Sequence, residues 1–140
     1  MFRTASLLTL SIALALPLSA QAQAVKRVPA PYTSPGSGSE MYVAYCASCH
    51  GLKGLGDGPV ATDLKVAVPD LTTLAKHNKG VFPDARVAQI IRGEVGARTH
   101  GALDMPVWGP VFRAFNDRQD SVIHQRVSNL TNYIGKLQAK

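Results

Sequence analysis

The chain has 140 residues, of which 46% are hydrophobic and 17% are charged. This length allows one ordinary domain, and this balance is typical of a compact soluble fold. The formal net charge is +6. The basic residues form no run interleaved with aromatic residues, which argues against nucleic-acid binding. Two cysteines are too few for a disulfide framework, so we expect them to serve local chemistry.

The N-terminus carries the pattern of a secretory signal peptide. Arg3 precedes an apolar stretch over residues 5–18, and small residues follow. The stretch is shorter than the about 20 residues that cross a bilayer, and the small residues are typical of a cleavage site. We expect a signal peptide over residues 1–22, with cleavage after Ala22 or, as an alternative, after Ala24. The mature protein is then expected in the periplasm, and an uncleaved anchor is the competing interpretation.

The segment after the signal peptide contains proline, glycine and serine without periodicity. We therefore expect a flexible leader over residues 23–36. The ordered domain is expected over residues 37–140. Ser37 and Glu40 have the spacing of a capping box, which predicts a short helix that leads to Cys46.

The central motif is Cys46-Ala47-Ser48-Cys49-His50, which has the C-x-x-C-H pattern of haem attachment. On a helical turn, thiols at i and i+3 face the same way and can add to the two vinyl groups of one porphyrin. Imidazole is a standard axial haem ligand, so we expect His50 to bind the iron and to donate its other ring proton to a carbonyl. The motif predicts one haem c, held by two thioethers.

Two other kinds of site would use the same atoms. If Cys46 and Cys49 were a thioredoxin-like redox pair, the fold would need a strand before the motif and a parallel sheet. The sequence indicates neither. A zinc site would combine the cysteines with two of the four histidines, which lack zinc-finger spacing. The histidines are His50, His77, His100 and His124.

The remaining elements are expected to be loops and helices. Residues 51–59 are too rich in glycine for a helix or strand. No strand is expected before them and no Gly-Lys-Ser/Thr sequence follows, which argues against a phosphate-binding loop. Helices are expected over residues 70–77 and 83–92, followed by a non-helical loop over residues 93–110. Apolar residues spaced by three and four predict an amphipathic helix over residues 121–138. These residues are Ile123, Val127, Leu130, Ile134 and Leu137.

Met105 is the expected second ligand of the iron. It lies in a loop rich in glycine and proline, where it has no helical or strand face to complete. Met1 leaves with the signal peptide, and Met41 is too close to Cys46 in sequence to reach the opposite face of the haem. His100 remains the main alternative, because imidazole also binds haem iron.

These motifs together resemble class I cytochrome c from Gly38 to the C-terminus. Gly38, Tyr42 and Cys46 have the Gly-x-x-x-aromatic-x-x-x-Cys spacing of the family's N-terminal helix. Residues 130–134 resemble its C-terminal helix, whose aromatic residue packs across the N-terminal helix. The resemblance implies that Tyr133 contacts Gly38 and Tyr42.

The resemblance also implies a fold and further site residues. The fold is expected to be mostly α, with crossing N- and C-terminal helices and with short helices and loops around one haem. Gly58-Pro59 should supply the carbonyl that accepts the imidazole proton, and Met105-Pro106 should begin the distal loop. Arg92 or Arg98 is expected to pair with a haem propionate. The expected apolar neighbours of the haem are Leu55, Leu64, Leu71, Ile91, Val107 and Trp108.

These expectations favour an electron carrier over an enzyme. If His50 and Met105 both bind the iron, no coordination position stays open to a substrate. The expected partners are redox proteins such as a membrane oxidase, a quinol-oxidising complex or a periplasmic dehydrogenase. The protein itself is expected to be a monomer or a subunit of a larger oxidoreductase. With an open position at the iron in place of Met105, the chain would instead be a gas sensor or a haem enzyme.

Overall fold

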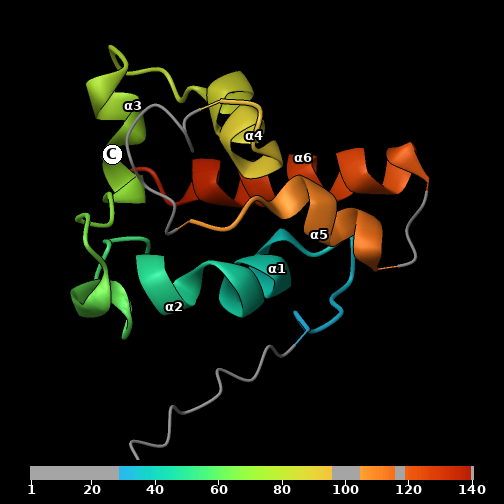
Figure 1. Ribbon diagram of the computed structural model, residues 1–140. Coiled ribbons are helices and arrows are strands. Elements are labelled where there is room, and N and C mark those ends of the chain that lie inside the picture. The colour runs from blue at the N-terminus through green and yellow to red at the C-terminus, as the bar shows by residue number, and fades with distance from the viewer. Residues whose placement is uncertain (1–28, 96–104, 116–118, 140) are drawn as a thin grey trace, which may run out of the picture.

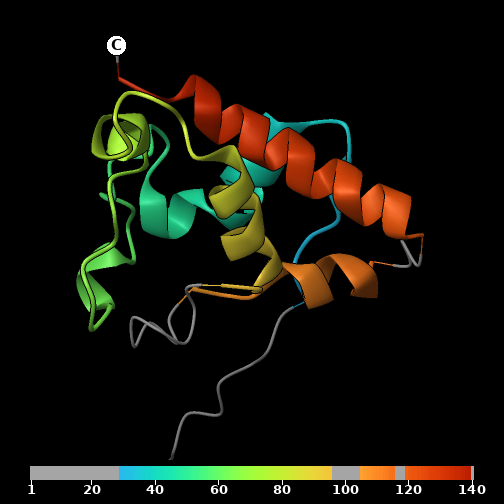
Figure 2. The same cartoon turned by 90° about the horizontal axis from the view of Figure 1, so that it is seen from above.

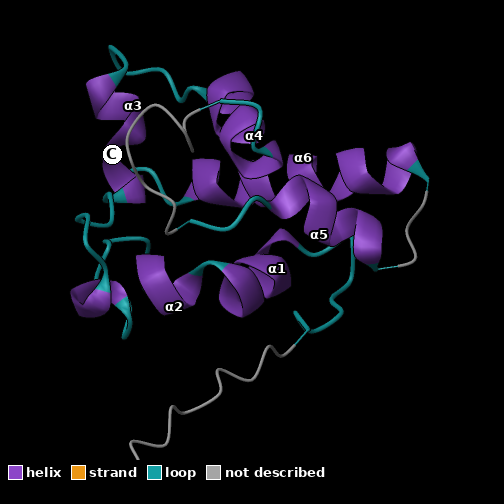
Figure 3. Ribbon diagram, viewed as in Figure 1, coloured by secondary structure: helices purple, strands orange, loops and turns teal. Residues whose placement is uncertain are grey.

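The structure, a computed structural model, describes residues 29–95, 105–115 and 119–139. The expected signal peptide, Arg98 and His100 lie outside these ranges. Within them, all regular secondary structure is helical and no strand occurs (Figure 3), which confirms the mostly α fold. The elements are α1 (Gly38–Tyr45), α2 (Ala47–His50), η1 (Ala61–Asp63), η2 (Leu71–Thr73), α3 (Leu74–His77), α4 (Asp84–Arg92), α5 (Trp108–Ala114) and α6 (Asp120–Lys136).

Helix α1 begins where the capping residues predicted it. Ser37 is the N-cap, and its hydroxyl accepts a hydrogen bond from the backbone N–H of Glu40 at 3.2 Å. The Glu40 carboxylate accepts from the N–H of Ser34 at 3.4 Å rather than from Ser37. In a standard capping box the Glu40 carboxylate would accept from the N–H of Ser37. Here it accepts from a residue three positions earlier in the chain.

The first and last helices cross, with α6 lying over α1 (Figures 1 and 2). At the crossing, a Cβ atom on Gly38 would lie 2.8 Å from the carbonyl carbon of Asn129 and 3.0 Å from Cβ of Tyr133. Only glycine allows this approach. The rings of Tyr42 and Tyr133 lie 5.1 Å apart, so the contacts that the resemblance implied are confirmed.

The predicted apolar face of α6 forms the centre of the core. The apolar residues of α6, which recur every three or four positions, pack against α1, α4 and α5. Helix α4 begins at Asp84 and ends at Arg92, within one residue of the predicted bounds, and Gly93 follows as its C-cap in a left-handed conformation with φ of 79°. The buried residues of α6 include Ile123, Val127, Leu130 and Ile134.

The expected loop over residues 93–110 is wrong at its C-terminal end, because α5 begins at Trp108. Pro110 lies in the first turn of this helix, where a missing N–H costs no intrahelical hydrogen bond. Gly109 allows the start of α5 to approach the end of α4, since a Cβ atom there would lie 2.8 Å from the carbonyl oxygen of Arg92. Glycine and proline therefore begin a helix here.

Residues 29–36 differ from the expected flexible leader. The Tyr45 hydroxyl donates to the carbonyl of Pro31 at 2.7 Å, and the buried Arg126 guanidinium donates to the carbonyl of Thr33 at 2.9 Å. The Asn129 amide donates to the carbonyl of Pro35 at 2.8 Å. These side chains of α1 and α6 hold the segment through its backbone, so it forms a strap over the two helices.

Candidate functional site

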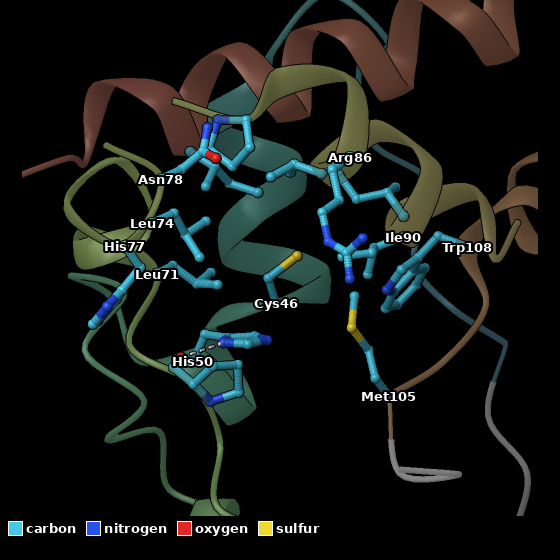
Figure 4. Close-up of a pocket in the computed structure, with 15 residues that line it drawn as sticks. Cys46, His50, Leu71, Leu74, His77, Asn78, Arg86, Ile90, Met105 and Trp108 are labelled. Carbon is cyan, nitrogen blue, oxygen red and sulfur yellow. Dashed lines mark hydrogen bonds between the residues drawn. The ribbon is translucent and has the colours of Figure 1, made fainter. Parts of the chain in front are cut away.

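A cavity of about 340 Å³ opens between α2, α3, α4 and the segment that leads into α5 (Figure 4). Most of its wall is apolar, and no acidic side chain among the described residues lines it. The lining residues are Cys46, His50, Pro69, Leu71, Leu74, His77, Asn78, Pro83, Arg86, Val87, Ile90, Ile91, Met105, Trp108 and Ile134. A flat apolar group with a few polar contacts suits such a wall.

His50 presents a neutral imidazole to this cavity. The residue is buried at the C-terminal end of α2, and burial lowers the pKa of its ring. Its Nδ1 lies 3.3 Å from the carbonyl oxygen of Pro69. Because a carbonyl oxygen can only accept, the ring proton is on Nδ1 and the lone pair of Nε2 is left to bind a metal.

The carbonyl that orients His50 is therefore that of Pro69, and the expectation that the Gly58-Pro59 pair supplies it is wrong. The Gly58-Pro59 pair instead packs behind α2. The N–H of Gly58 donates to the carbonyl of Cys49 at 3.0 Å, and a Cβ atom on Gly58 would lie 2.6 Å from the same carbonyl. Gly58 thus allows the loop over residues 51–59 to lie close to α2. The carbonyl that reaches the His50 imidazole comes from Pro69, further along the chain.

Both cysteines are free thiols, and only Cys46 is among the lining residues of the cavity. Cys46 is buried and lines the cavity, and Cys49 follows it by one helical turn and is half-buried. Burial, and then the nearby Cys49, raise the pKa of the Cys46 thiol to about 12. Redox-active thiol pairs have lowered pKa values. Together with the absence of strands among the described residues, this contradicts the thioredoxin-like alternative.

The zinc alternative also lacks support from the part of the chain that the structure describes. There, no three cysteine, histidine or acidic side chains gather as they would around a metal ion.

Met105 lines the same cavity as His50 from a different part of the chain. It is half-buried in the segment just before α5, and its thioether points into the cavity. Figure 4 shows the His50 ring and the Met105 side chain entering from different sides. Imidazole and thioether are a known pair of haem ligands.

The comparison with known families agrees with this geometry. The family model described as Cytochrome c matches residues 36–138. The chain belongs to the cytochrome c family. Members of this family carry electrons on a covalently attached haem c, and Cys46, Cys49 and His50 have the C-x-x-C-H spacing of that attachment. No curated protein and no solved structure matches the chain.

The residues of this cytochrome c domain fit a haem. A thiol, an imidazole with a free lone pair and a thioether line one largely apolar cavity. Of the expected apolar neighbours, Leu71, Ile91 and Trp108 line it. The expectation is wrong for the other three: Leu55 is 47% exposed, Leu64 is absent from the wall, and Val107 packs on Gly93.

The arginine expectations also change. Arg92 does not line the cavity of this cytochrome c domain, and its guanidinium pairs with the Glu94 carboxylate at 2.9 Å. Arg86 lines the cavity and precedes Arg92 by six residues on α4, and no sequence pattern singled it out. The sequence also gave no sign of Leu74, Pro83 or Ile134 in the wall.

Trp108 connects the cavity wall to a group of packed aromatic rings. Its ring lies 4.9 Å from that of Tyr45 and 6.0 Å from that of Phe112. Trp108 is therefore held in place by aromatic rings of α1 and α5.

Proposed function

We propose that this protein is a monohaem c-type cytochrome that transfers single electrons between redox partners, with its iron held by His50 and Met105. The observation that carries this proposal is the shared cavity. A neutral imidazole with its Nε2 lone pair free and a thioether enter the cavity from separate segments, beside the thiol of Cys46. His77 also lines the cavity, but Figure 4 shows its ring pointing away from the cavity centre.

Attachment would use the thiols of Cys46 and Cys49. The two side chains would hold the haem through thioether links, each made by addition of S–H to a vinyl group with the proton passing to the neighbouring carbon. This addition is redox-neutral, and it needs the thiols reduced, as both are here. Two such links would hold the porphyrin edge at α2, directly beside His50.

When bound, the haem supplies an iron that alternates between the ferrous and ferric states. His50 and Met105 would both hold the iron, which would leave a substrate no place to bind it. Thioether ligation favours the reduced ion relative to a second imidazole, and the apolar wall favours the lower charge of the reduced site. These properties support a carrier of electrons rather than an enzyme.

The proposed setting is the periplasm. The N-terminal residues 1–22 have the pattern of a cleavable signal peptide, and none of the described helices is both long enough and apolar enough to cross a membrane. The proposed partners are proteins such as a membrane oxidase, a quinol-oxidising complex or a periplasmic dehydrogenase. The protein would meet them as a diffusing monomer or as a bound subunit.

The test is the mass and colour of the exported protein together with three variants. The wild type should gain the mass of one haem that resists acid and organic solvent. Cys46→Ala and Cys49→Ala should each keep one thioether, and His50→Ala should yield little stable holoprotein. The control is His124→Ala, because His124 is exposed on α6. Holoprotein from His50→Ala with normal yield and spectrum would refute the proposal.

A further inference from the structure

Arg86 is the one arginine that lines the cavity among the described residues. It is exposed and yet forms part of the cavity wall, so it lies at the mouth of the cavity. Figure 4 shows its guanidinium pointing from α4 towards the cavity, between Cys46 and Trp108. Within the part of the chain that the structure describes, this guanidinium makes no hydrogen bond and no ion pair.

The other polar groups at the cavity are already engaged or directed elsewhere. His50 donates to Pro69, and the Asn78 amide donates to the carbonyl of Val81 at 2.8 Å. The His77 ring points away from the cavity centre in Figure 4. Arg86 therefore presents the available cationic donor of this wall.

The Arg86 guanidinium is exposed, so it keeps water on its outer side. A group that fills the cavity would approach its inner side, where a charge-assisted hydrogen bond to an anion is the strongest contact that an arginine makes. The described wall supplies no carboxylate. An anionic partner inside the cavity would therefore belong to the occupant, and the anionic groups of a haem are its two propionates.

We infer that Arg86 binds a propionate carboxylate of the haem and orients that edge of the cofactor towards the mouth of the cavity beside α4. This inference rests on the proposed function. The planar fork of arginine matches a carboxylate with two parallel hydrogen bonds, which lysine cannot reproduce. Arg86 would also offset one negative charge near the iron and so help to hold the ferrous state.

The experiment compares wild type, Arg86→Gln, Arg86→Lys and Arg92→Gln as purified holoproteins. Arg92→Gln is the matched control, because it removes the same charge from the same helix at a side chain that pairs with Glu94 outside the cavity wall. The first readout is the reduction potential. The second is the redox-difference infrared spectrum of haem whose propionate carboxylates carry carbon-13.

We expect Arg86→Gln to lower the potential, with about a tenfold change in the one-electron equilibrium constant, which equals about 59 mV. Arg86→Lys should give a potential between those of Arg86→Gln and wild type. The labelled carboxylate bands should shift in both Arg86 variants and stay unchanged in Arg92→Gln. If Arg86→Gln yields no holoprotein, the band shift in Arg86→Lys carries the test.

Unchanged carboxylate bands in the Arg86 variants would overturn the inference while leaving the proposed function intact. A lowered potential with unchanged bands would also overturn it, because it would show a charge effect without contact. The absence of covalent haem from the wild type would instead refute the proposed function itself, and this inference with it. The three failures are therefore distinguishable.

Discussion

The ring of Tyr42 lies 5.1 Å from the ring of Tyr133, at an angle of 45° between their planes. This contact joins α1 to α6 across the helix crossing. The Tyr42 hydroxyl also donates to the carbonyl of Gly51 at 2.8 Å, one residue after His50. One side chain therefore connects the helix crossing to the residue that follows the candidate haem ligand.

Gly38→Ala should destabilise the fold. The added methyl group would meet the backbone carbonyl of Asn129, which cannot move without shifting α6. Overpacking of this kind costs about 1–3 kcal/mol. Denaturant unfolding of the holoprotein measures the change. The control is Gly36→Ala, whose methyl group would meet only the Ser34 hydroxyl at 3.7 Å, and equal stability of the two variants would contradict the close crossing.

Tyr42→Phe should cost about 1–3 kcal/mol, because it leaves the Gly51 carbonyl without its buried donor. Tyr133→Phe is the matched control, since the structure shows no hydrogen bond from the Tyr133 hydroxyl to a described residue. Unfolding curves of the two variants give the comparison. A larger loss from Tyr133→Phe than from Tyr42→Phe would show that the hydroxyl roles are assigned the wrong way round.

Tyr45→Phe should loosen the strap of residues 29–36. It removes a donor to the Pro31 carbonyl and a contact with the Thr33 hydroxyl, each at 2.7 Å. Amide hydrogen exchange in the strap should become faster while exchange in α6 is unchanged. Tyr32→Phe serves as the control, because Tyr32 is 62% exposed. A strap that exchanges equally fast in both variants would mean that the Tyr45 hydroxyl does not hold it.

Asp70 should make the stability of the segment before α3 depend on pH. Its side chain caps η2 by accepting from the N–H and the hydroxyl of Thr72, and these hydrogen bonds lower its pKa below the usual 3.8. A carboxylate with a lowered folded-state pKa contributes stability that is complete above its unfolded value and is lost as the pH falls through the folded value.

The melting temperature of Asp70→Ala should accordingly lie below that of wild type at neutral pH. The difference should shrink as the pH is lowered from about 5 to about 2. Asp63→Ala, at an exposed position, is the control and should show no comparable change. A difference that persists unchanged at the acid end would contradict the role of the ionised cap.

The parts of the fold that the sequence predicted well are those with local signals. The cap at Ser37, the bounds of α4 and the apolar period of α6 each depend on signals within a few residues, so each can be predicted from the sequence alone. Helix α5 was missed because Gly109 and Pro110 usually break helices. They begin one here because α5 packs against the end of α4, which no local pattern reveals.

The site divides in the same way. The attachment motif and Met105 have distinctive side chains, whereas Pro69 acts through a backbone carbonyl that every residue possesses. Only the path of the loop decides which carbonyl reaches His50. Arg86 was missed because its direction from α4 into the cavity depends on tertiary packing. The strap was missed because its contacts are made by backbone carbonyls without side-chain periodicity.

The central claim is that His50 and Met105 bind the same iron, and the most direct measurement is the near-infrared spectrum of the oxidised protein. Wild type should show the weak charge-transfer band of a methionine–ferric iron bond, and it should bind carbon monoxide only slowly or weakly when reduced. Met105→Ala should keep its covalent haem, lose the band and bind carbon monoxide readily. A wild type that lacks the band and binds carbon monoxide as readily as the variant would contradict the assignment of Met105 and the carrier function that depends on it.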